Sequence, residues 1–151
     1  MKLALLLALF LAVPYSPVKK YDPSRNADKD IKDAIVEAQR TGKRILLEVG
    51  GDWCRWCHIM DDYFDKNPNL TASRDANFIT VKINFSPENE NEKVLSKYPK
   101  IPGYPHLIVL DTNGMLLHSQ NTSELEQGES YNLGKFTEFL KKWAPQSAAS
   151  K

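Results

Sequence analysis

Residues 44–60, RILLEVGGDWCRWCHIM, contain the pattern that decides the fold. The run Ile45–Val49 is rich in leucine and β-branched residues and predicts a buried strand. Two glycines and an aspartate then predict a turn, and a segment that can be helical begins at Cys54. The only two cysteines of the chain, Cys54 and Cys57, stand at this junction in the spacing C-x-x-C. The predicted order is strand, turn, cysteine pair and helix.

Size and charge limit the class of protein. The chain has 151 residues, of which 42% are hydrophobic, and this suits one domain with a single core. There are 20 lysines and arginines against 19 aspartates and glutamates, so the net charge is close to zero. This balance gives no electrostatic reason to expect binding to nucleic acid or to a charged membrane surface. We expect one globular domain that is a monomer.

Residues 1–16 have the composition of an export signal. A basic start at Lys2 precedes an apolar run of about eleven residues, which is shorter than the roughly 20 that a membrane-spanning helix needs. We therefore expect export from the cytoplasm, to the periplasm or a similar compartment. No A-x-A cleavage motif follows, and Pro14 and Pro17 crowd the cleavage region, so an uncleaved membrane anchor is the alternative.

Three further segments follow this signal region. Residues 17–25 contain prolines and polar residues and predict a tether. Residues 26–145 form the predicted domain, and residues 146–151 a flexible tail with nothing to bury. Apolar residues at helical spacing over 31–38 predict an N-terminal helix that ends at Gly42.

The rest of the chain predicts a mixed sheet. The expected elements are helices at 54–64 and 88–98, a helical connector at 70–75, strands at 78–85, 106–110 and 115–118, a polar loop at 119–130 and a last helix at 133–143. Helices between strands imply parallel pairing, and the turn Asp111–Gly114 implies an antiparallel hairpin. The fold class is therefore α/β, with a mixed central sheet, helices on both faces and an extra N-terminal helix.

Glu48 is the one charged residue of the first strand. Strand alternation places it on one face with Leu46 and Gly50, opposite Ile45 and the other apolar residues. A carboxylate is costly to bury in its ionised form, so Glu48 either faces water or is held near a group that uses protons. The sequence leaves the two possibilities open.

The cysteine pair predicts dithiol chemistry. At a helix N-terminus, free backbone N–H groups and the helix dipole favour the thiolate of Cys54, which makes it the nucleophile. Cys57 is then the resolving thiol that displaces the product from a mixed disulfide. The positive charge of Arg55 adds to the stabilisation of the thiolate.

Two motifs resemble the thioredoxin-fold family. Trp53-Cys54-Arg55-Trp56-Cys57 matches its W-C-x-x-C motif, and Tyr104-Pro105 stands before a strand where the family has a cis-proline. The resemblance extends from about Ile45 to Trp143. The preceding segment and helix are similar to those of exported bacterial thioredoxin-like proteins.

The resemblance implies roles for five residues besides the cysteines. Glu48 stands where thioredoxins have a buried acid that assists proton transfer at the resolving cysteine, and Lys82 where they have its lysine partner. Pro105, if cis, would lie against the disulfide and present a substrate strand together with Tyr104 and Trp53.

The resemblance also implies a function. The protein is expected to be a thiol-disulfide oxidoreductase that acts on protein thiols and disulfides outside the cytoplasm and is recharged by a redox partner protein. It would need no metal and no cofactor besides the Cys54–Cys57 disulfide. Arg55-Trp56 replaces the usual Gly-Pro pair, and Glu48 replaces an aspartate. Together with His58, these residues are expected to tune the redox potential, so the direction of electron flow stays open.

Three alternatives use the same residues. The motif C-x-x-C-H at residues 54–58 also attaches c-type haem, with His58 as proximal and Met115 as distal ligand, although small c-type cytochromes are mostly helical. Zinc could bind the two cysteines with two of His58, His106 and His118. Finally, the disulfide could be structural, in a non-catalytic thioredoxin-like binding domain.

Overall fold

The computed structural model describes residues 15–146, so most of the predicted signal region and tail lie outside it. Its helices are α1 (Ala27–Thr41), α2 (Arg55–Lys66), α3 (Pro68–Asn77), the short α4 (Glu92–Leu95), the 3₁₀ helix η1 (Thr122–Leu125) and α5 (Leu133–Trp143). Its strands are β1 (Arg44–Gly50), β2 (Phe78–Asn84), β3 (His106–Leu110), β4 (Leu116–Asn121), β5 (Glu126–Gln127) and β6 (Ser130–Tyr131). Among the helices so described, none has the length and apolar character needed to cross a membrane.

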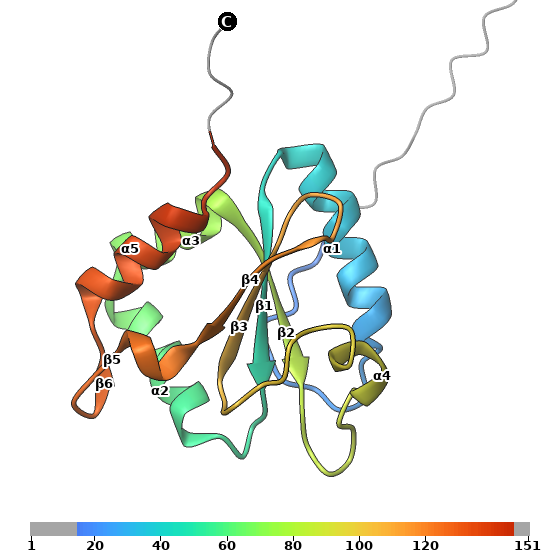
Figure 1. The fold of residues 1–151 in the computed structure, drawn as a ribbon, viewed down its shortest axis with the longest axis horizontal. Coiled ribbons are helices and arrows are strands. Elements are labelled where there is room, and N and C mark those ends of the chain that lie inside the picture. The colour runs from blue at the N-terminus through green and yellow to red at the C-terminus, as the bar shows by residue number, and fades with distance from the viewer. Residues whose placement is uncertain (1–14, 147–151) are drawn as a thin grey trace, which may run out of the picture.

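The central sheet has the strand order β2-β1-β3-β4. Strand β1 pairs in parallel with β2 and antiparallel with β3, and β3 pairs antiparallel with β4. Parallel neighbours need a crossover connection, which α2 and α3 provide. Figure 1 shows α1 on one side of this sheet and α2, α3 and α5 on the other. The predicted mixed sheet with helices on both faces is confirmed. The parallel pairing expected for the strand at 106–110 is wrong, because β3 is antiparallel to β1.

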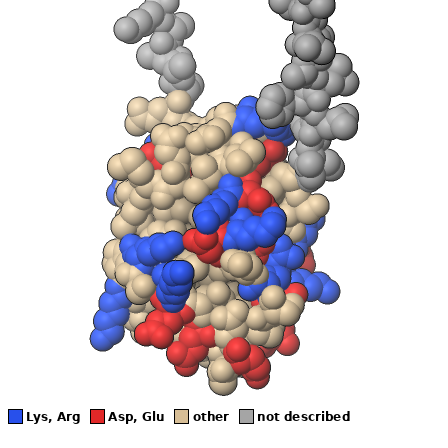
Figure 2. Space-filling view, turned by 90° about the vertical axis from the view of Figure 1, so that its right-hand side faces the viewer, with Lys and Arg blue, Asp and Glu red and all other residues tan. Residues whose placement is uncertain are grey.

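Charged side chains of both signs cover the outer side of α1. The helix has ion pairs one turn apart, such as Lys29–Asp33 and Lys32–Asp28, both at 2.6 Å. Figure 2 shows both signs of charge on this side of the molecule. Acidic side chains gather at the bottom of the view, which is the end at which β1 and β2 finish in Figure 1. Helix α1 therefore has one solvated side and one side that packs on the sheet.

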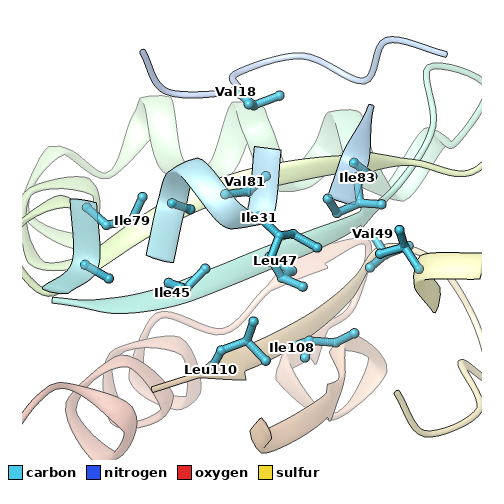
Figure 3. Packing of buried hydrophobic residues seen from close by; sticks show 14 residues of the cluster. Val18, Ile31, Ile45, Leu47, Val49, Ile79, Val81, Ile83, Ile108 and Leu110 are labelled. Atoms are coloured by element: carbon cyan, nitrogen blue, oxygen red, sulfur yellow. The ribbon is translucent and has the colours of Figure 1, made fainter. Parts of the chain in front are cut away.

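Alternation along β1 creates two separate cores. Its odd-numbered residues pack against α1 in an apolar cluster, shown in Figure 3, that includes Ile45, Leu47, Val49, Ile79, Val81, Ile83, Ile108 and Leu110. Its even-numbered Leu46 belongs to the cluster under α2, α3 and α5, which includes Met60, Phe64, Leu107, Val109, Phe136 and Leu140. Glu48 is on this second face.

Local signals begin and end the helices. The side chain of Asn26 accepts a hydrogen bond from the backbone N–H of Lys29 and caps α1, and Gly42, with φ of 73°, ends that helix. Asn67 is the C-cap of α2, and Pro68 then takes the first position of α3, where a proline costs no hydrogen bond. These residues set the lengths of the helices that surround the sheet.

Two predicted segments are wrong in extent. The helix expected over 88–98 is reduced to α4, because side chains fix the preceding loop: the amide of Asn84 donates to the carbonyl of Asn89 at 2.9 Å. The polar loop expected over 119–130 contains the end of β4, η1 and the small hairpin β5–β6. Pairing with β3 extends β4 to Asn121, beyond the predicted end at His118.

The segment predicted as a tether packs against the edge of the sheet. Val18 is buried and forms a bridge with Val81, and its carbonyl accepts a hydrogen bond from the backbone N–H of Lys82 at 3.2 Å. Further along, the amide of Asn89 donates to the carbonyl of Pro23 at 2.8 Å. Part of residues 17–25 therefore belongs to the folded body, which differs from the predicted start at residue 26.

Candidate active site

Cys54 and Cys57 form a disulfide at the start of α2, with their Cα atoms 5.2 Å apart. Both are buried, at 3% and 0% exposure. Cys54 is the N-cap residue of the helix, and its sulfur accepts a hydrogen bond from the backbone N–H of Cys57 at 3.2 Å. A helix N-terminus stabilises negative charge, so this placement favours a thiolate at Cys54 once the bond opens.

Gly50 lets the disulfide lie directly on the end of β1. A Cβ atom at Gly50 would be only 2.5 Å from the sulfur of Cys57 and 3.0 Å from the hydroxyl oxygen of Tyr21. Any other residue would push the helix away from the strand. The face of β1 that includes Glu48 is therefore the face on which Cys57 lies.

Burial of Glu48 answers the question that the sequence left open. Its side chain is 1% exposed, and neither carboxylate oxygen has a hydrogen-bond partner. Burial raises the pKa of this carboxyl, while the nearby ammonium of Lys82 opposes the shift. Glu48 is thus a buried carboxyl with a raised pKa, on the face of β1 that the cysteines cover.

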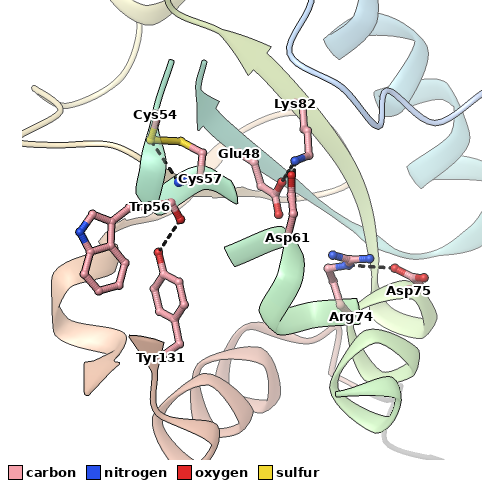
Figure 4. Close-up of polar contacts among 9 residues, drawn as sticks. All are labelled: Glu48, Cys54, Trp56, Cys57, Asp61, Arg74, Asp75, Lys82 and Tyr131. Carbon is pink, nitrogen blue, oxygen red and sulfur yellow. Dashed lines mark hydrogen bonds and ion pairs between the residues drawn. A yellow bond between two sulfur atoms is a disulfide. The ribbon is translucent and has the colours of Figure 1, made fainter. Parts of the chain in front are cut away.

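Lys82 connects Glu48 with a second carboxylate. Glu48 and Lys82 are direct partners in the parallel register of β1 and β2, and the Lys82 nitrogen lies 3.5 Å from a Glu48 oxygen. The same nitrogen donates to Asp61 of α2 at 2.5 Å (Figure 4). Asp61 has 42% of its side chain exposed, whereas Lys82 has 8%. A chain of charged groups therefore extends from the buried carboxyl to the surface.

Asp61 was not among the predicted site residues, although the sequence contains a signal for it. Asp61 stands four residues after Cys57 on a predicted helix, so both residues share one helix face. A carboxylate one turn after the resolving cysteine lies close enough to act in the same site.

The side chains of Trp53, Phe85 and Tyr104 form an aromatic frame beside the disulfide. Trp53 is 57% exposed, and its indole N–H donates to the carbonyl of Phe85 at 2.7 Å. Its ring meets Tyr104 edge-on at 5.8 Å, and Tyr104 stacks on Phe85 at 4.7 Å. The structure thus brings the predicted Trp53 and Tyr104 together and adds Phe85, which follows β2 and gave no distinct sequence signal.

Pro105 follows a cis peptide bond, as predicted. The proline is buried, and its carbonyl accepts a hydrogen bond from the hydroxyl of Thr122 at 2.5 Å. Thr122 begins η1, directly after β4. The loop that positions Tyr104 beside Trp53 is therefore held by the far edge of the sheet.

The residues predicted to tune the site lie around the first turn of α2. Arg55 and His58 are exposed, and a ring nitrogen of His58 lies 2.6 Å from the carbonyl oxygen of Asp52. Trp56 meets the ring of Tyr131 edge-on, and its carbonyl accepts from the Tyr131 hydroxyl at 3.4 Å. His58 thus fixes the loop before the cysteines, and Trp56 anchors α2 on the β5–β6 hairpin.

A family model described as thioredoxin-like matches residues 26–112, more than half of the chain. The chain belongs to the thioredoxin-like family. The matched region begins at the cap of α1 and includes both cysteines and Pro105. Membership of this family confirms the predicted thioredoxin-like fold.

Several relatives of this thioredoxin-like protein have names that describe disulfide chemistry. The thiol:disulfide interchange protein DsbD of Pseudomonas sp. (strain JR1 / K1) is 29% identical in an alignment of 128 residues that covers 80% of this chain and 20% of DsbD. The disulfide bond reductase DsbH of Chlamydia pneumoniae is 26% identical over 94 residues, 56% of each chain. The chain thus spans about a fifth of the length of the DsbD relatives that it matches.

Solved structures show the same fold. A disulphide isomerase from Xylella fastidiosa Temecula1 superposes with a TM-score of 0.69 at 26% identity, covering 81% of this chain and 94% of that one. The oxidised C-terminal domain of DsbD from Neisseria meningitidis gives a TM-score of 0.58 at 19% identity, covering 78% and 96%. Thioredoxin-like domains with disulfide chemistry are therefore the structural neighbours of this chain.

The haem interpretation does not fit the positions of its two ligands. His58 lies at the end of the sheet where β1 finishes, whereas Met115 follows the turn between β3 and β4. Since Ile45 at the start of β1 pairs with Leu110 at the end of β3, this turn is at the opposite end of the sheet. The two side chains cannot face the two sides of one haem.

The histidines of the zinc interpretation have other contacts. A ring nitrogen of His106 lies 2.7 Å from the hydroxyl of Ser119, and His118 stacks on Trp143 at 4.4 Å. Within residues 15–146, no three or more His, Cys, Asp or Glu side chains gather where they could hold a metal ion.

Proposed function

We propose that this protein is a thiol-disulfide oxidoreductase that exchanges its Cys54–Cys57 pair with thiols and disulfides of proteins outside the cytoplasm. One observation is the main support: the disulfide at the start of α2 lies over a buried carboxyl, Glu48, on the adjoining strand. The relatives are named for disulfide interchange, reduction and isomerisation, which agrees with this chemistry.

The exchange begins at Cys54, the cysteine at the helix N-terminus. In the oxidised protein, a thiolate of the redox partner attacks the Cys54 sulfur, a new S–S bond forms, and the Cys54–Cys57 bond breaks. The electron pair of the broken bond goes to Cys57, and a second partner thiolate then releases Cys54 and leaves the partner as a disulfide. With a substrate disulfide the reduced protein runs these steps in reverse, and Cys57 displaces the reduced substrate.

Glu48 exchanges a proton with Cys57. When Cys57 leaves as a thiolate, the protonated carboxyl of Glu48 donates a proton to it, and when Cys57 attacks a mixed disulfide, Glu48 accepts the proton back. Burial raises the pKa of Glu48, which is the direction that proton donation to Cys57 needs. Lys82 and the partly exposed Asp61 connect Glu48 with solvent, where the proton is exchanged.

The aromatic frame is the proposed contact surface for the substrate chain. Trp53, Tyr104 and Pro105 flank the disulfide, and an extended substrate strand would lie against the Pro105 loop. A cleft lined in part by Trp53, Phe85 and Glu88 continues this surface. The proposed substrates are therefore proteins that place an apolar segment next to their cysteine.

Two cysteine variants test the proposed function. Cys54→Ser is expected to abolish reduction of a protein disulfide, because the attacking sulfur is lost. Cys57→Ser should accumulate mixed disulfides that non-reducing gels and mass spectrometry detect, because the resolving thiol is lost. Full reductase activity in Cys54→Ser would overturn the mechanism, and an unreactive Cys54 would favour a structural disulfide.

A redox titration determines the direction of electron flow. A potential near thioredoxin's roughly −270 mV indicates a reductant, and one near roughly −120 mV an oxidant. The proposed location of the protein outside the cytoplasm is based on the composition of residues 1–16. Fractionation of cells that express the full chain tests it, and recovery of the protein from the cytoplasm alone would contradict export.

A further inference from the structure

Tyr21 reaches the disulfide from the segment that precedes the first helix. Hydrogen bonds fix this segment on both sides of Tyr21: the carbonyl of Val18 accepts from the Lys82 N–H at 3.2 Å, and the carbonyl of Pro23 accepts from the Asn89 amide at 2.8 Å. The tyrosine is therefore held in place by the edge strand and by the loop after it.

The hydroxyl of Tyr21 is buried and has no hydrogen-bond partner. It lies 3.0 Å from the point where a Cβ of Gly50 would be, and the sulfur of Cys57 lies 2.5 Å from the same point. No side chain occupies that point, so the hydroxyl and the sulfur both border the space above the glycine. A buried hydroxyl without a partner costs free energy, and one that gains a partner in another state of the site stabilises that state.

Charged groups from three elements surround this hydroxyl. The Lys82 ammonium of β2 lies 4.5 Å from the centre of the Tyr21 ring, and Glu48 of β1 and Asp61 of α2 are the acidic groups nearby. Burial raises the pKa of the phenol well above 10, and the two carboxylates, together with Tyr131 of β6, raise it further. The phenol therefore keeps its proton and acts as a hydrogen-bond donor.

We propose that Tyr21 is a positioning residue of the reduced site, whose hydroxyl donates a hydrogen bond to the sulfur of Cys57 once the disulfide opens. A sulfur in a disulfide is a weak acceptor, whereas a thiolate is a strong one. When the Cys54–Cys57 bond breaks, the electron pair goes to Cys57, and the proton that neutralises it comes from Glu48. Tyr21 keeps its own proton throughout, stabilises the charge before the proton of Glu48 arrives, and stays bonded to the sulfur in the reduced site.

This inference rests on the proposed function and adds a part to it. The segment before α1 becomes a component of the active site, because it supplies the hydroxyl that faces the resolving cysteine. A donor that serves only the reduced form shifts the redox equilibrium toward the dithiol.

Tyr21→Phe tests the role of the hydroxyl alone, since it keeps the ring and its contact with Lys82. A hydrogen bond worth about 1 kcal/mol corresponds to about a fivefold change in an equilibrium. We expect the equilibrium with glutathione to shift about fivefold toward the disulfide, which is a potential about 20 mV more negative. Fluorescence or mass spectrometry of samples in glutathione buffers measures the shift.

Tyr15→Phe is the matched control. Tyr15 is in the same segment and also has a buried hydroxyl without a partner, but its charged neighbours are Arg25 and, on α1, Asp30, Asp33 and Glu37. Its replacement should leave the glutathione equilibrium unchanged within twofold. An equal shift in both variants would assign the effect to the packing of the segment and overturn the inference.

A kinetic measurement separates positioning from packing. We expect the rate at which Cys57 resolves a preformed mixed disulfide at Cys54 to fall about fivefold in Tyr21→Phe near neutral pH, with its pH midpoint moved upward. An unchanged profile and an unchanged equilibrium would overturn the inference and leave the proposed function intact. A wild-type protein without exchange activity would instead overturn the proposed function.

A measurement on the wild-type protein covers the case in which the variant does not fold. With tyrosines labelled by ¹³C at the ring carbon that bears the hydroxyl, the Tyr21 signal should move when the disulfide is reduced, and the Tyr15 signal should not. A Tyr21 signal that stays in place on reduction would contradict the hydrogen bond.

Discussion

The two faces of the central sheet differ in what they bury. Toward α1, strands β1 and β2 present only hydrocarbon, from Ile45, Leu47, Val49, Ile79, Val81 and Ile83. Toward α2, the same strands present Glu48 and Lys82, and Cys57 packs on Gly50. On these two strands the first face has no titratable side chain. The second face has a buried carboxyl and a buried ammonium group beside the sulfurs.

This difference separates stability from chemistry. Hydrocarbon that leaves water stabilises the fold, by about 25 cal/mol for each Å² buried. A buried carboxyl without a hydrogen bond opposes folding and persists where it serves function. Replacements on the α1 face should therefore change stability without changing exchange, whereas replacements around Glu48 should change the rate of exchange.

Leu47→Ala should give the largest effect on the α1 face. Leu47 is fully buried, and its truncation leaves a cavity that costs about 3 kcal/mol of unfolding free energy. Urea denaturation followed by circular dichroism measures the loss. Exchange per folded molecule should stay within twofold of wild type, and a tenfold fall in it would contradict the separation of the two faces.

Glu48→Gln should give the largest effect on the other face. The amide has the same shape but cannot transfer a proton, so the rate of mixed-disulfide resolution at pH 7 should fall about 10²-fold. Stopped-flow kinetics with a model disulfide measure it. The control is Glu138→Gln on the exposed side of α5, where we expect no change. Equal rates in the Glu48 variant and in wild type would remove this carboxyl from the mechanism.

The difference in stability between wild type and Glu48→Gln should change with pH. Burial raises the pKa of this carboxyl above the 4.5 of a free glutamate. Below pH 4.5 the group is protonated in both states, and wild type and Glu48→Gln should be equally stable. As pH rises from 4.5 toward the raised pKa, only the unfolded wild-type chain ionises, so the folded wild type loses stability relative to the variant.

The expected gain of Glu48→Gln at neutral pH is about 1–2 kcal/mol of unfolding free energy. Chemical denaturation at pH 4 and pH 7 measures it. A variant that is less stable than wild type at pH 7 would show that Lys82 stabilises an ionised Glu48 more than burial penalises it.

Asp61→Asn should have a smaller effect on the same face. The amide still accepts from Lys82, but a neutral acceptor is weaker than a carboxylate by about 1 kcal/mol, so exchange should fall about fivefold at pH 7. The negative charge of Asp61 also helps to raise the pKa of Glu48, and its loss should move the pH midpoint of exchange downward. An upward movement in the pH–rate profile would exclude this coupling.

His58→Ala should have the smallest effect. The ring is exposed and contacts the carbonyl of Asp52, away from the buried carboxyl. We expect less than about 0.5 kcal/mol change in unfolding free energy and less than a twofold change in exchange. A tenfold change in the redox equilibrium would instead make His58 a tuning residue, as the sequence allowed.

The sequence was sufficient for features that depend on near neighbours. Strand alternation over 44–50, the C-x-x-C spacing at a helix start and the X-Pro bond before a strand involve residues a few positions apart, and each is found as predicted. The resemblance also placed Lys82 as the partner of Glu48, which the parallel register bears out.

Features that depend on the path of the chain escaped prediction. The burial of Glu48 required the arrival of α2, because alternation alone places a residue on a face without saying what covers it. Phe85 joins the aromatic frame through Tyr104, and no spacing in the sequence relates the two. The expected helix at 88–98 was shortened by side-chain bonds in the loop before it, which outweigh local propensity.

The sequence by itself therefore determined the strand, the reactive pair and its place at a helix N-terminus, since each is set by local periodicity and spacing. Only the tertiary structure decided what surrounds that pair. It brings Tyr21 to Cys57 across Gly50 and connects Asp61 to Lys82, over long separations along the chain. The reason is physical: close packing fixes which distant side chains meet, and no local pattern records that choice.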